Sequence, residues 1–276
     1  MLVAATYSTS NYEKTRKYNA KMAYKKGKVD KVFEFDESHL SEEFKQKNQR
    51  ILSCKRGAGY WIWKPYIINR VLKELAYDDY LFYCDSGAFV FRDIHSLLPL
   101  METHETDMLV FEIDLIEKNW TKRDVFVELD CDSREYTESK QRCATYFLVK
   151  KTKRTEGFVE EWLRYAQKYE LISDEDNILH KQPNYEGFRE NRHDQSIFSI
   201  LSKKYGYQAF EDISQYRNGY SGMERWKEER RLKKNQNYPV MVCLHRQKKA
   251  DGSTRVRQSL VDYFPKARKY VYWGYR

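Results

Sequence analysis

The chain has 276 residues, of which 41% are hydrophobic and 33% charged, and its formal net charge is +9. These values predict a soluble, globular protein with one large α/β domain, or one such domain and a small appendage. No apolar stretch approaches the roughly 20 residues that span a bilayer, which excludes a spanning helix. The five cysteines are scattered without a Cys-x-x-Cys pair, so a reduced, cytoplasmic setting is favoured over a disulfide framework.

In chain order, short apolar runs alternate with helical patterns. We expect strands at 2–6 and 31–35, a helix at 13–26 between them, and a polar helix that Ser41 caps and that continues to about residue 52. Pro65 suits the first turn of the next helix.

Strands are then predicted at 80–84, 108–113 and 144–149, followed by an amphipathic helix at 158–169. A last helix at 196–205 has Asp194 near its N-cap and Gly206 just past its end. This alternation over the first 210 residues or so predicts a mostly parallel sheet with crossover helices. From about residue 217 the character changes to a dense charge run and a basic, aromatic tail.

Asp85, Ser86 and Gly87 follow the predicted strand at 80–84 directly. A carboxylate at the carboxyl end of such a strand can ligate Mg²⁺ or Mn²⁺, which bridges phosphate oxygens, and small neighbours let a nucleotide approach the backbone. The alternative interpretation is an ordinary turn at the end of a strand.

The segment 56–65 reads Arg-Gly-Ala-Gly-Tyr-Trp-Ile-Trp-Lys-Pro. Gly57 and Gly59 permit a tight turn, and Lys64 is expected just before a helix N-terminus, where cation and helix dipole both favour a phosphate. The spacing matches neither a Walker loop nor Gly-x-Gly-x-x-Gly. In the alternative interpretation, Trp61 and Trp63 anchor the core and Lys64 is merely exposed.

Two further polar positions have both a functional and a structural interpretation. Asp194, followed by Gln195, is either a helix cap or a cleft carboxylate that accepts a proton or holds a sugar hydroxyl. His245 follows an apolar run and is either a metal ligand or phosphate contact, or an ordinary buried polar residue.

These motifs occur in a familiar order: Thr6 with Asn11-Tyr12, the segment 56–66, Tyr83-Cys-Asp-Ser-Gly, and Arg192-His-Asp-Gln-Ser. The sequence resembles bacterial GT-A-fold glycosyltransferases of capsule and lipopolysaccharide biosynthesis over roughly residues 1–215. The resemblance implies a GT-A-like (Rossmann-like) sheet flanked by helices, with a catalytic domain at 1–215 and a basic C-terminal segment at 216–276 packed on it.

The resemblance also implies a nucleotide-sugar donor, with UDP favoured, and a polysaccharide or lipid-linked glycan acceptor. Asp194 and Gln195 would lie near the anomeric carbon in a hexosyltransferase, and their Asp-Gln pattern favours retention. Gly87 stands where the family has the second aspartate of its Asp-x-Asp metal motif. Either this departure removes the metal, or a ligand for Mn²⁺ or Mg²⁺ is supplied from elsewhere, by His245 together with Asp85. The expected donor-binding residues are Thr6, Arg56, Gly57, Gly59, Trp63, Lys64, Asp85, Ser86, Gly87 and His193.

Two other classes of function are compatible with parts of the sequence. The charge and the aromatic content suit a nucleic-acid-binding protein, but the sequence has no RRM-like strand or helix-turn-helix, so no nucleic-acid partner is expected. A non-catalytic scaffold of polysaccharide assembly would be expected to lose Asp85 or Asp194, and both are present. We expect a cytoplasmic enzyme that also attaches peripherally to the inner face of the membrane through the tail at 266–276; the alternative is that this tail packs on the domain.

Overall fold

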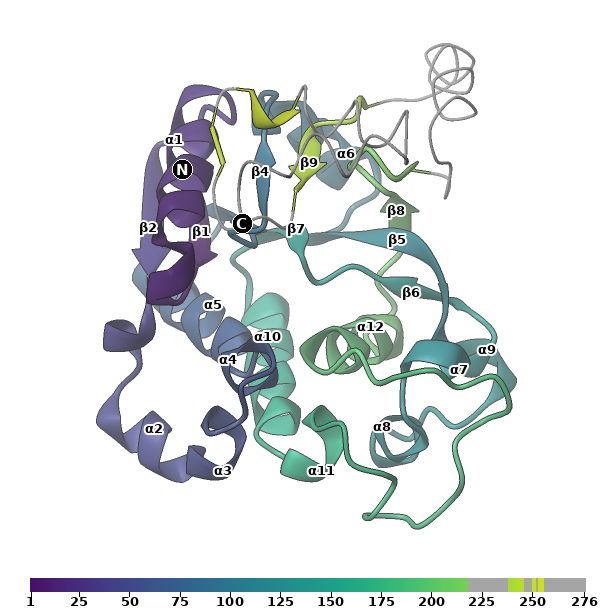
Figure 1. The fold of residues 1–276 in the computed structure, drawn as a ribbon. Coiled ribbons are helices and arrows are strands. Elements are labelled where there is room, and N and C mark those ends of the chain that lie inside the picture. Colours follow the sequence, from purple (N-terminus) through teal and green to yellow (C-terminus); the bar gives the residue numbers. More distant parts are fainter. Residues whose placement is uncertain (218–237, 246–249, 252, 256–276) are drawn as a thin grey trace.

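The computed structural model describes residues 1–217, 238–245, 250–251 and 253–255. These residues form a seven-stranded sheet in the order β2-β1-β3-β7-β5-β6, with β8 also paired to β5, and a separate pair β4-β9 (Figure 1). The strands are β1 (Leu2–Tyr7), β2 (Lys31–Phe35), β3 (Tyr80–Cys84), β4 (Ala88–Val90), β5 (Met108–Ile116), β6 (Lys140–Arg142), β7 (Tyr146–Lys150), β8 (Ala209–Glu211) and β9 (Val242–Leu244).

Helices cover both faces of the large sheet. The longer ones are α1 (Glu13–Lys25), α5 (Trp63–Glu74), α10 (Lys153–Ala166) and α12 (Asp194–Lys204). The shorter ones are α2 (Glu42–Lys47), α3 (Gln49–Leu52), α4 (Gly57–Tyr60), α6 (Leu98–Thr103), α7 (Glu117–Trp120), α8 (Arg123–Glu128), α9 (Arg134–Thr137) and α11 (Tyr169–Ile172), with 3₁₀ turns η1 (Ser10–Tyr12), η2 (Glu37–His39) and η3 (Ile94–Leu97).

The strand directions confirm the predicted α/β class with a mostly parallel sheet. β1 is parallel to both β2 and β3. β7 is antiparallel to β3 and to β5, so β5 has the direction of β3, and β8 is parallel to β5. Among the described strands of this sheet, only β7 and β6 oppose the others.

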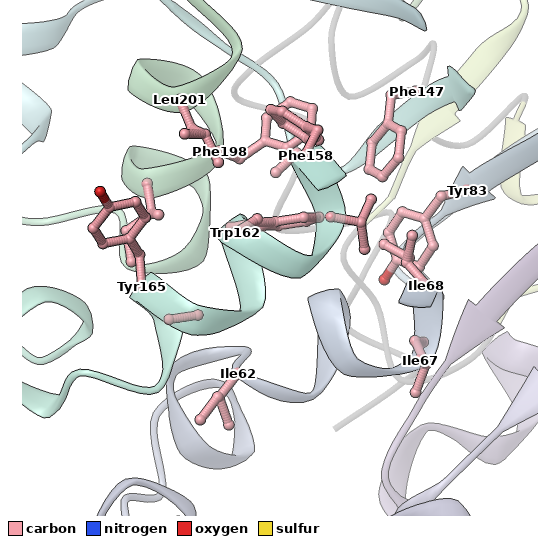
Figure 2. Close-up of a cluster of buried hydrophobic side chains, with 14 of the residues drawn as sticks. Ile62, Ile67, Ile68, Tyr83, Phe147, Phe158, Trp162, Tyr165, Phe198 and Leu201 are labelled. Carbon is pink, nitrogen blue, oxygen red and sulfur yellow. The ribbon is translucent and has the colours of Figure 1, made fainter. Parts of the chain in front are cut away.

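The core follows the period of two in the strands. In β3, Leu81 and Tyr83 belong to the core on one face of the sheet, while Phe82 and Cys84 belong to the core on the other. The first core is filled by aromatic residues from α10 and α12, with Trp162 near its centre (Figure 2). Because both faces are buried, β3 is a continuous apolar run that ends only where the sheet ends, at Asp85.

The helix expected to continue from Ser41 to residue 52 is two helices. Ser41 caps the first as predicted, since its Oγ accepts a hydrogen bond from the backbone N–H of Phe44 at 3.2 Å. Asn48 ends α2 with φ −111° and ψ 22°, and its Nδ2 donates to the Phe44 carbonyl at 2.8 Å. The amide side chain thus satisfies a backbone carbonyl at the break, a local competition that favours helix ends.

The charge run at 224–234 and the tail at 266–276 lie outside the described residues. Within the described part of 216–276, β9 pairs antiparallel with β4, which attaches this segment to the part of the chain before residue 216. None of the described helices is long and apolar enough to cross a bilayer.

Candidate active site

A cleft of about 1170 Å³ opens where β1 and β3 end. The carboxyl edge of parallel strands is where open α/β sheets bind ligands. Five segments that are far apart in the sequence supply most of its lining: 7–12, 52–58, 85–87, 112–115 and 192–195. Thr6 is wholly buried and does not line the cleft, whereas the residues that follow it do.

The backbone at 57–61 forms a left-handed turn. All five residues have positive φ, with Gly59 at +93° and the non-glycine residues Ala58, Tyr60 and Trp61 between +51° and +61°. A Cβ on Gly59 would lie 3.0 Å from the Cα of Leu52. Left-handed geometry costs about 1–2 kcal/mol for each non-glycine residue, so surrounding contacts must hold this turn.

Trp63 supplies two of those contacts. Its Nε1 donates to the Gly57 carbonyl at 2.9 Å, and its ring stacks on Tyr7 with centroids 3.9 Å apart. Of the two tryptophans considered as core anchors, Trp63 is buried and Trp61 is half-buried. The turn and its anchor fix the direction in which α5 begins.

Lys64 lies inside the first turn of α5 and not before it, and its side chain is only 3% exposed, so the interpretation as an exposed lysine is wrong. Its Nζ lies 2.9 Å from Oδ2 of Asp194 and 3.2 Å from Oδ1 of Asp85, and it donates to the Ala144 carbonyl at 3.2 Å. Burial disfavours the ammonium, but the two carboxylates outweigh this effect and raise the pKa of Lys64. The ammonium thus contacts both carboxylates and the Ala144 carbonyl, so we expect Lys64 to hold the carboxylates in place and not to contact a phosphate.

The two carboxylates differ in exposure. The N-cap of α12 is His193, and Asp194 is the first helical residue, with its side chain 4% exposed. Burial raises the pKa of Asp194 to about 6, although Lys64 opposes the rise. Asp85 is 21% exposed and accepts a hydrogen bond from the Tyr83 hydroxyl. One ammonium therefore lies between two carboxylates that line the cleft, one almost fully buried and one part-exposed.

Gln195 lies next to this cluster with its carboxamide already engaged. Oε1 accepts from the backbone N–H of Ala144 at 3.2 Å, and Nε2 donates to Oε1 of Gln141 at 2.8 Å. The Trp162 indole N–H donates to the Asp194 carbonyl at 3.0 Å, which ties the start of α12 to α10.

A second charged cluster at the cleft includes two residues that the sequence did not indicate, Asp174 and Glu190. Arg56 contacts Oδ1 of Asp174 at 2.9 Å and Oε2 of Glu190 at 2.7 Å. His193 Nε2 lies 2.9 Å from the same Asp174 oxygen, and its ring stacks on Tyr60 at 5.0 Å. Burial lowers the pKa of His193 to about 4, so the imidazole is neutral near pH 7. Both acidic residues are more than 110 positions from Arg56, and no local pattern marks them.

The strand pair β4-β9 brings His245 to the turn that carries Asp85. The backbone N–H of His245 donates to the Gly87 carbonyl at 2.9 Å. The side chain is buried, and burial lowers the pKa of His245 to about 4, which leaves the neutral imidazole that metals bind. Across the residues that the structure describes, no group of three or more His, Cys, Asp or Glu side chains forms a ready metal cage.

Several solved structures have a similar fold at low sequence identity. The apo form of mouse xyloside xylosyltransferase 1 is 10% identical, with a TM-score of 0.44 over 88% of this chain and 96% of that one. The galactosyltransferase LgtC, in complex with donor and acceptor sugar analogues, is 14% identical, with a TM-score of 0.41 over 88% of this chain and 86% of that one. The apo-form glycosyltransferase GlyE of Streptococcus pneumoniae is 15% identical, with a TM-score of 0.43 over 99% of this chain and 63% of that one.

At these identities and TM-scores the likenesses carry no argument about activity. No family model matches the sequence, and the search of curated proteins finds no match.

Proposed function

We propose that the protein is a GT-A-fold glycosyltransferase that moves a sugar from a nucleotide-diphosphate sugar, with UDP favoured, to a polysaccharide or lipid-linked glycan of capsule or lipopolysaccharide synthesis. The observation that carries the proposal is the convergence of Asp85, Lys64 and Asp194 in a cleft at the carboxyl ends of parallel strands. The motifs that contain these residues also carry the resemblance to the family.

The donor is assigned to the part of the cleft between 7–12 and the left-handed turn. A volume of about 1170 Å³ accommodates a nucleotide sugar, since small-molecule sites commonly measure roughly 300–1000 Å³. Ser86 and Gly87 offer little side-chain bulk there, which favours a close approach of the diphosphate to the backbone.

We propose that a divalent Mn²⁺ or Mg²⁺ ion binds at Asp85. The cluster of Asp85, Lys64 and Asp194 has two carboxylates and one ammonium, and a diphosphate adds further negative charge. Asp85 and the neutral imidazole of His245 would hold the ion, with phosphate oxygens and water completing its shell. When bound, the ion would neutralise charge on the leaving diphosphate. The chain itself holds Asp85 in position through Tyr83 and Lys64.

Asp194 and Gln195 are proposed to lie beside the anomeric carbon and the acceptor. Their Asp-Gln pattern favours a retaining reaction, in which the pair positions the donor. In an inverting reaction, Asp194 would instead be the general base for the acceptor hydroxyl. NMR of the anomeric configuration of the product distinguishes the two.

The test of the donor site compares two aspartates at opposite ends of β3. Asp85→Asn removes the cleft carboxylate, and we expect transfer to fall by about 10²–10³-fold because the cation that would neutralise the diphosphate loses its carboxylate ligand. Asp78→Asn is the matched control, since Asp78 is 76% exposed and precedes the strand. A thermal-shift panel of nucleotides should show the largest stabilisation with UDP and Mn²⁺ together. Normal turnover of Asp85→Asn in EDTA-treated buffer would contradict the proposal.

We also propose reversible attachment to the inner face of the cytoplasmic membrane through the tail at 266–276, which mixes Lys and Arg with Tyr and Trp. Each basic residue near an anionic leaflet contributes about 1 kcal/mol, and this attraction weakens with salt. Flotation with anionic liposomes at low and high salt, using the full chain and residues 1–264, measures the contribution of the tail. Equal flotation of a folded 1–264 protein would remove the tail as the anchor.

A further inference from the structure

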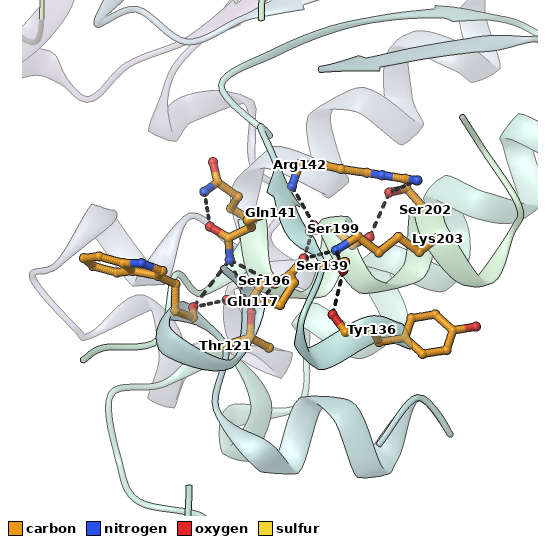
Figure 3. Close-up of polar contacts among 12 residues, drawn as sticks. Glu117, Thr121, Tyr136, Ser139, Gln141, Arg142, Ser196, Ser199, Ser202 and Lys203 are labelled. Carbon is orange, nitrogen blue, oxygen red and sulfur yellow. Dashed lines mark hydrogen bonds and ion pairs between the residues drawn. The ribbon is translucent and has the colours of Figure 1, made fainter. Parts of the chain in front are cut away.

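Glu117, at the start of α7, is a fully buried carboxylate whose hydrogen bonds all come from the protein (Figure 3). Its Oε1 accepts from Lys203 Nζ at 2.6 Å and from the Ser199 hydroxyl. Its Oε2 accepts from the Thr121 hydroxyl at 2.7 Å and from Gln141 Nε2 at 3.3 Å. Because it is paired with the Lys203 ammonium, Glu117 is an ionised carboxylate, which can only accept hydrogen bonds.

The charge of Glu117 determines which way the Gln141 carboxamide points. Only an NH₂ group is compatible with a carboxylate oxygen, so Gln141 must direct Nε2 toward Glu117. The Thr121 hydroxyl already donates to Glu117, and it therefore accepts from the same Nε2 at 3.2 Å. The carbonyl oxygen of Gln141 is then left to face Gln195.

The same logic fixes Gln195. An oxygen on Gln141 requires the NH₂ of Gln195, which lies 2.8 Å away, and Gln195 Oε1 is then left for the backbone N–H of Ala144. Ala144 gives an independent check, because a backbone N–H also needs an acceptor. Rotating the Gln195 amide by 180° would place oxygen against oxygen at Gln141 and NH₂ against N–H at Ala144. Glu117 at one end of this series of hydrogen bonds and the Ala144 N–H at the other thus require the same orientation of the Gln195 amide.

We propose that Gln141 is a positioning residue that locks the carboxamide of Gln195 in the cleft, with the direction of the lock set by the buried charge of Glu117. Each carboxamide has two N–H donors and two acceptor lone pairs. The lock uses one of each on Gln195 and leaves one N–H and one lone pair for a bound molecule. If the Gln195 amide were rotated by 180°, the free N–H and the free lone pair would exchange their positions in the cleft. This inference rests on the proposed function in one respect, that Gln195 lies beside the transferred sugar.

The first test uses NMR to measure whether the Gln195 carboxamide is held in place, and it does not depend on activity. The side-chain NH₂ signals of Gln195, assigned by their loss in Gln195→Ala, should be dispersed and show restricted motion in the full-length protein. In Gln141→Leu they should collapse toward the positions of exposed glutamines while the backbone spectrum is retained. Ser202→Ala is the matched control, because Ser202 accepts from Arg142 at the far side of the same polar cluster and has no bond to Gln195.

The second test reads the consequence for turnover with UDP-sugars as probes. We expect Gln141→Leu to lower kcat about 10- to 100-fold with KM for the donor changed less than about 3-fold, since misplacement of a positioning group acts mainly on the reacting geometry. If Gln141→Leu does not fold, the double variant Glu117→Gln with Lys203→Met removes the charge in a balanced pair and should give two sets of Gln195 NH₂ signals.

Unchanged Gln195 signals in whichever of these variants folds would overturn the lock. Collapsed signals with unchanged kcat would overturn its role in positioning. If the protein transfers no sugar, the NMR result still decides whether the lock exists, so failure of the proposed function and failure of this inference are distinguishable.

Discussion

Lys64, which is buried, and Lys203, whose side chain is 11% exposed, are both paired with carboxylates, yet the charges around them differ. Lys64 lies between Asp85 and Asp194, so this cleft cluster has one cation and two anions. Lys203 pairs with Glu117 near a second cation, the buried Arg142, so this wall cluster has two cations and one anion. The first opens to the cleft through Asp85, whereas the carboxylate of the second is fully buried.

This difference indicates that the cleft cluster can bind a ligand, whereas the wall cluster only supports the structure. Every oxygen of Glu117 is occupied by protein donors, so this carboxylate has no capacity left for a ligand. The cleft cluster keeps an excess negative charge and an exposed edge, which is where a cation would be stabilised. Burial alone therefore does not indicate which ion pair is functional; charge balance and remaining hydrogen-bonding capacity do.

The largest expected effect on stability is at the wall cluster. Lys203→Met leaves Glu117 as an unpaired, fully buried carboxylate, which costs about 3–5 kcal/mol of unfolding free energy. Lys64→Met should cost less, about 1–3 kcal/mol, because Asp194 can take up a proton and Asp85 is part-exposed. Urea unfolding of both variants measures the difference. A larger loss of unfolding free energy in Lys64→Met than in Lys203→Met would contradict the assigned difference between the two clusters.

The second prediction concerns pH and Asp194. The pKa of Asp194 is raised in the folded protein to about 6, above its unfolded value of about 3.9. Its contribution to stability is therefore fully present below the unfolded pKa and is lost as pH rises through about 6, by about 3 kcal/mol in total. The unfolding free energy of the wild type, minus that of Asp194→Asn, should fall accordingly between pH 4 and pH 7. A difference that rises or stays flat over this window would contradict the assigned environment.

The smallest expected effect is at the left-handed turn at 57–61, which precedes Lys64. Gly59→Ala places a Cβ 3.0 Å from the Cα of Leu52 at a φ of +93°, and we expect a loss of about 1–2 kcal/mol. Gly157→Ala is the control, because it lies inside α10 with the nearest new contact at 3.9 Å. There, the better helix propensity of alanine should stabilise the protein by about 0.5–1 kcal/mol. Thermal or urea unfolding of the pair should give opposite signs; equal effects would exclude strain at 57–61.

Local patterns in the sequence were sufficient for much of the fold. The apolar run of β3, the Ser41 cap and the Gly206 stop each depend on neighbours within a few residues, and each was predicted. The burial of Lys64 was not predictable in this way, because it depends on Asp85 and Asp194, which come from the ends of other elements. Asp174, Glu190, Glu117 and Gln141 were missed for the same reason: their partners are distant in the sequence, and a lone polar residue has no periodicity.

The antiparallel pairing of β7 with β3 affects how well the segment between them can accommodate insertions and deletions. Cys84 pairs with Tyr146, and the N–H of Asp85 donates to the Thr145 carbonyl at 2.8 Å. The chain thus leaves the centre of the cleft at Asp85, builds β4, α6, β5 and β6, and returns to its starting point. Backbone hydrogen bonds between β3 and β7 join the two ends of this segment, so it forms a closed loop. The conformational entropy lost on closing a loop grows only with the logarithm of the loop length. Insertions or deletions in its exposed turns should therefore reshape the rim of the cleft while Asp85 and Thr145 stay in register.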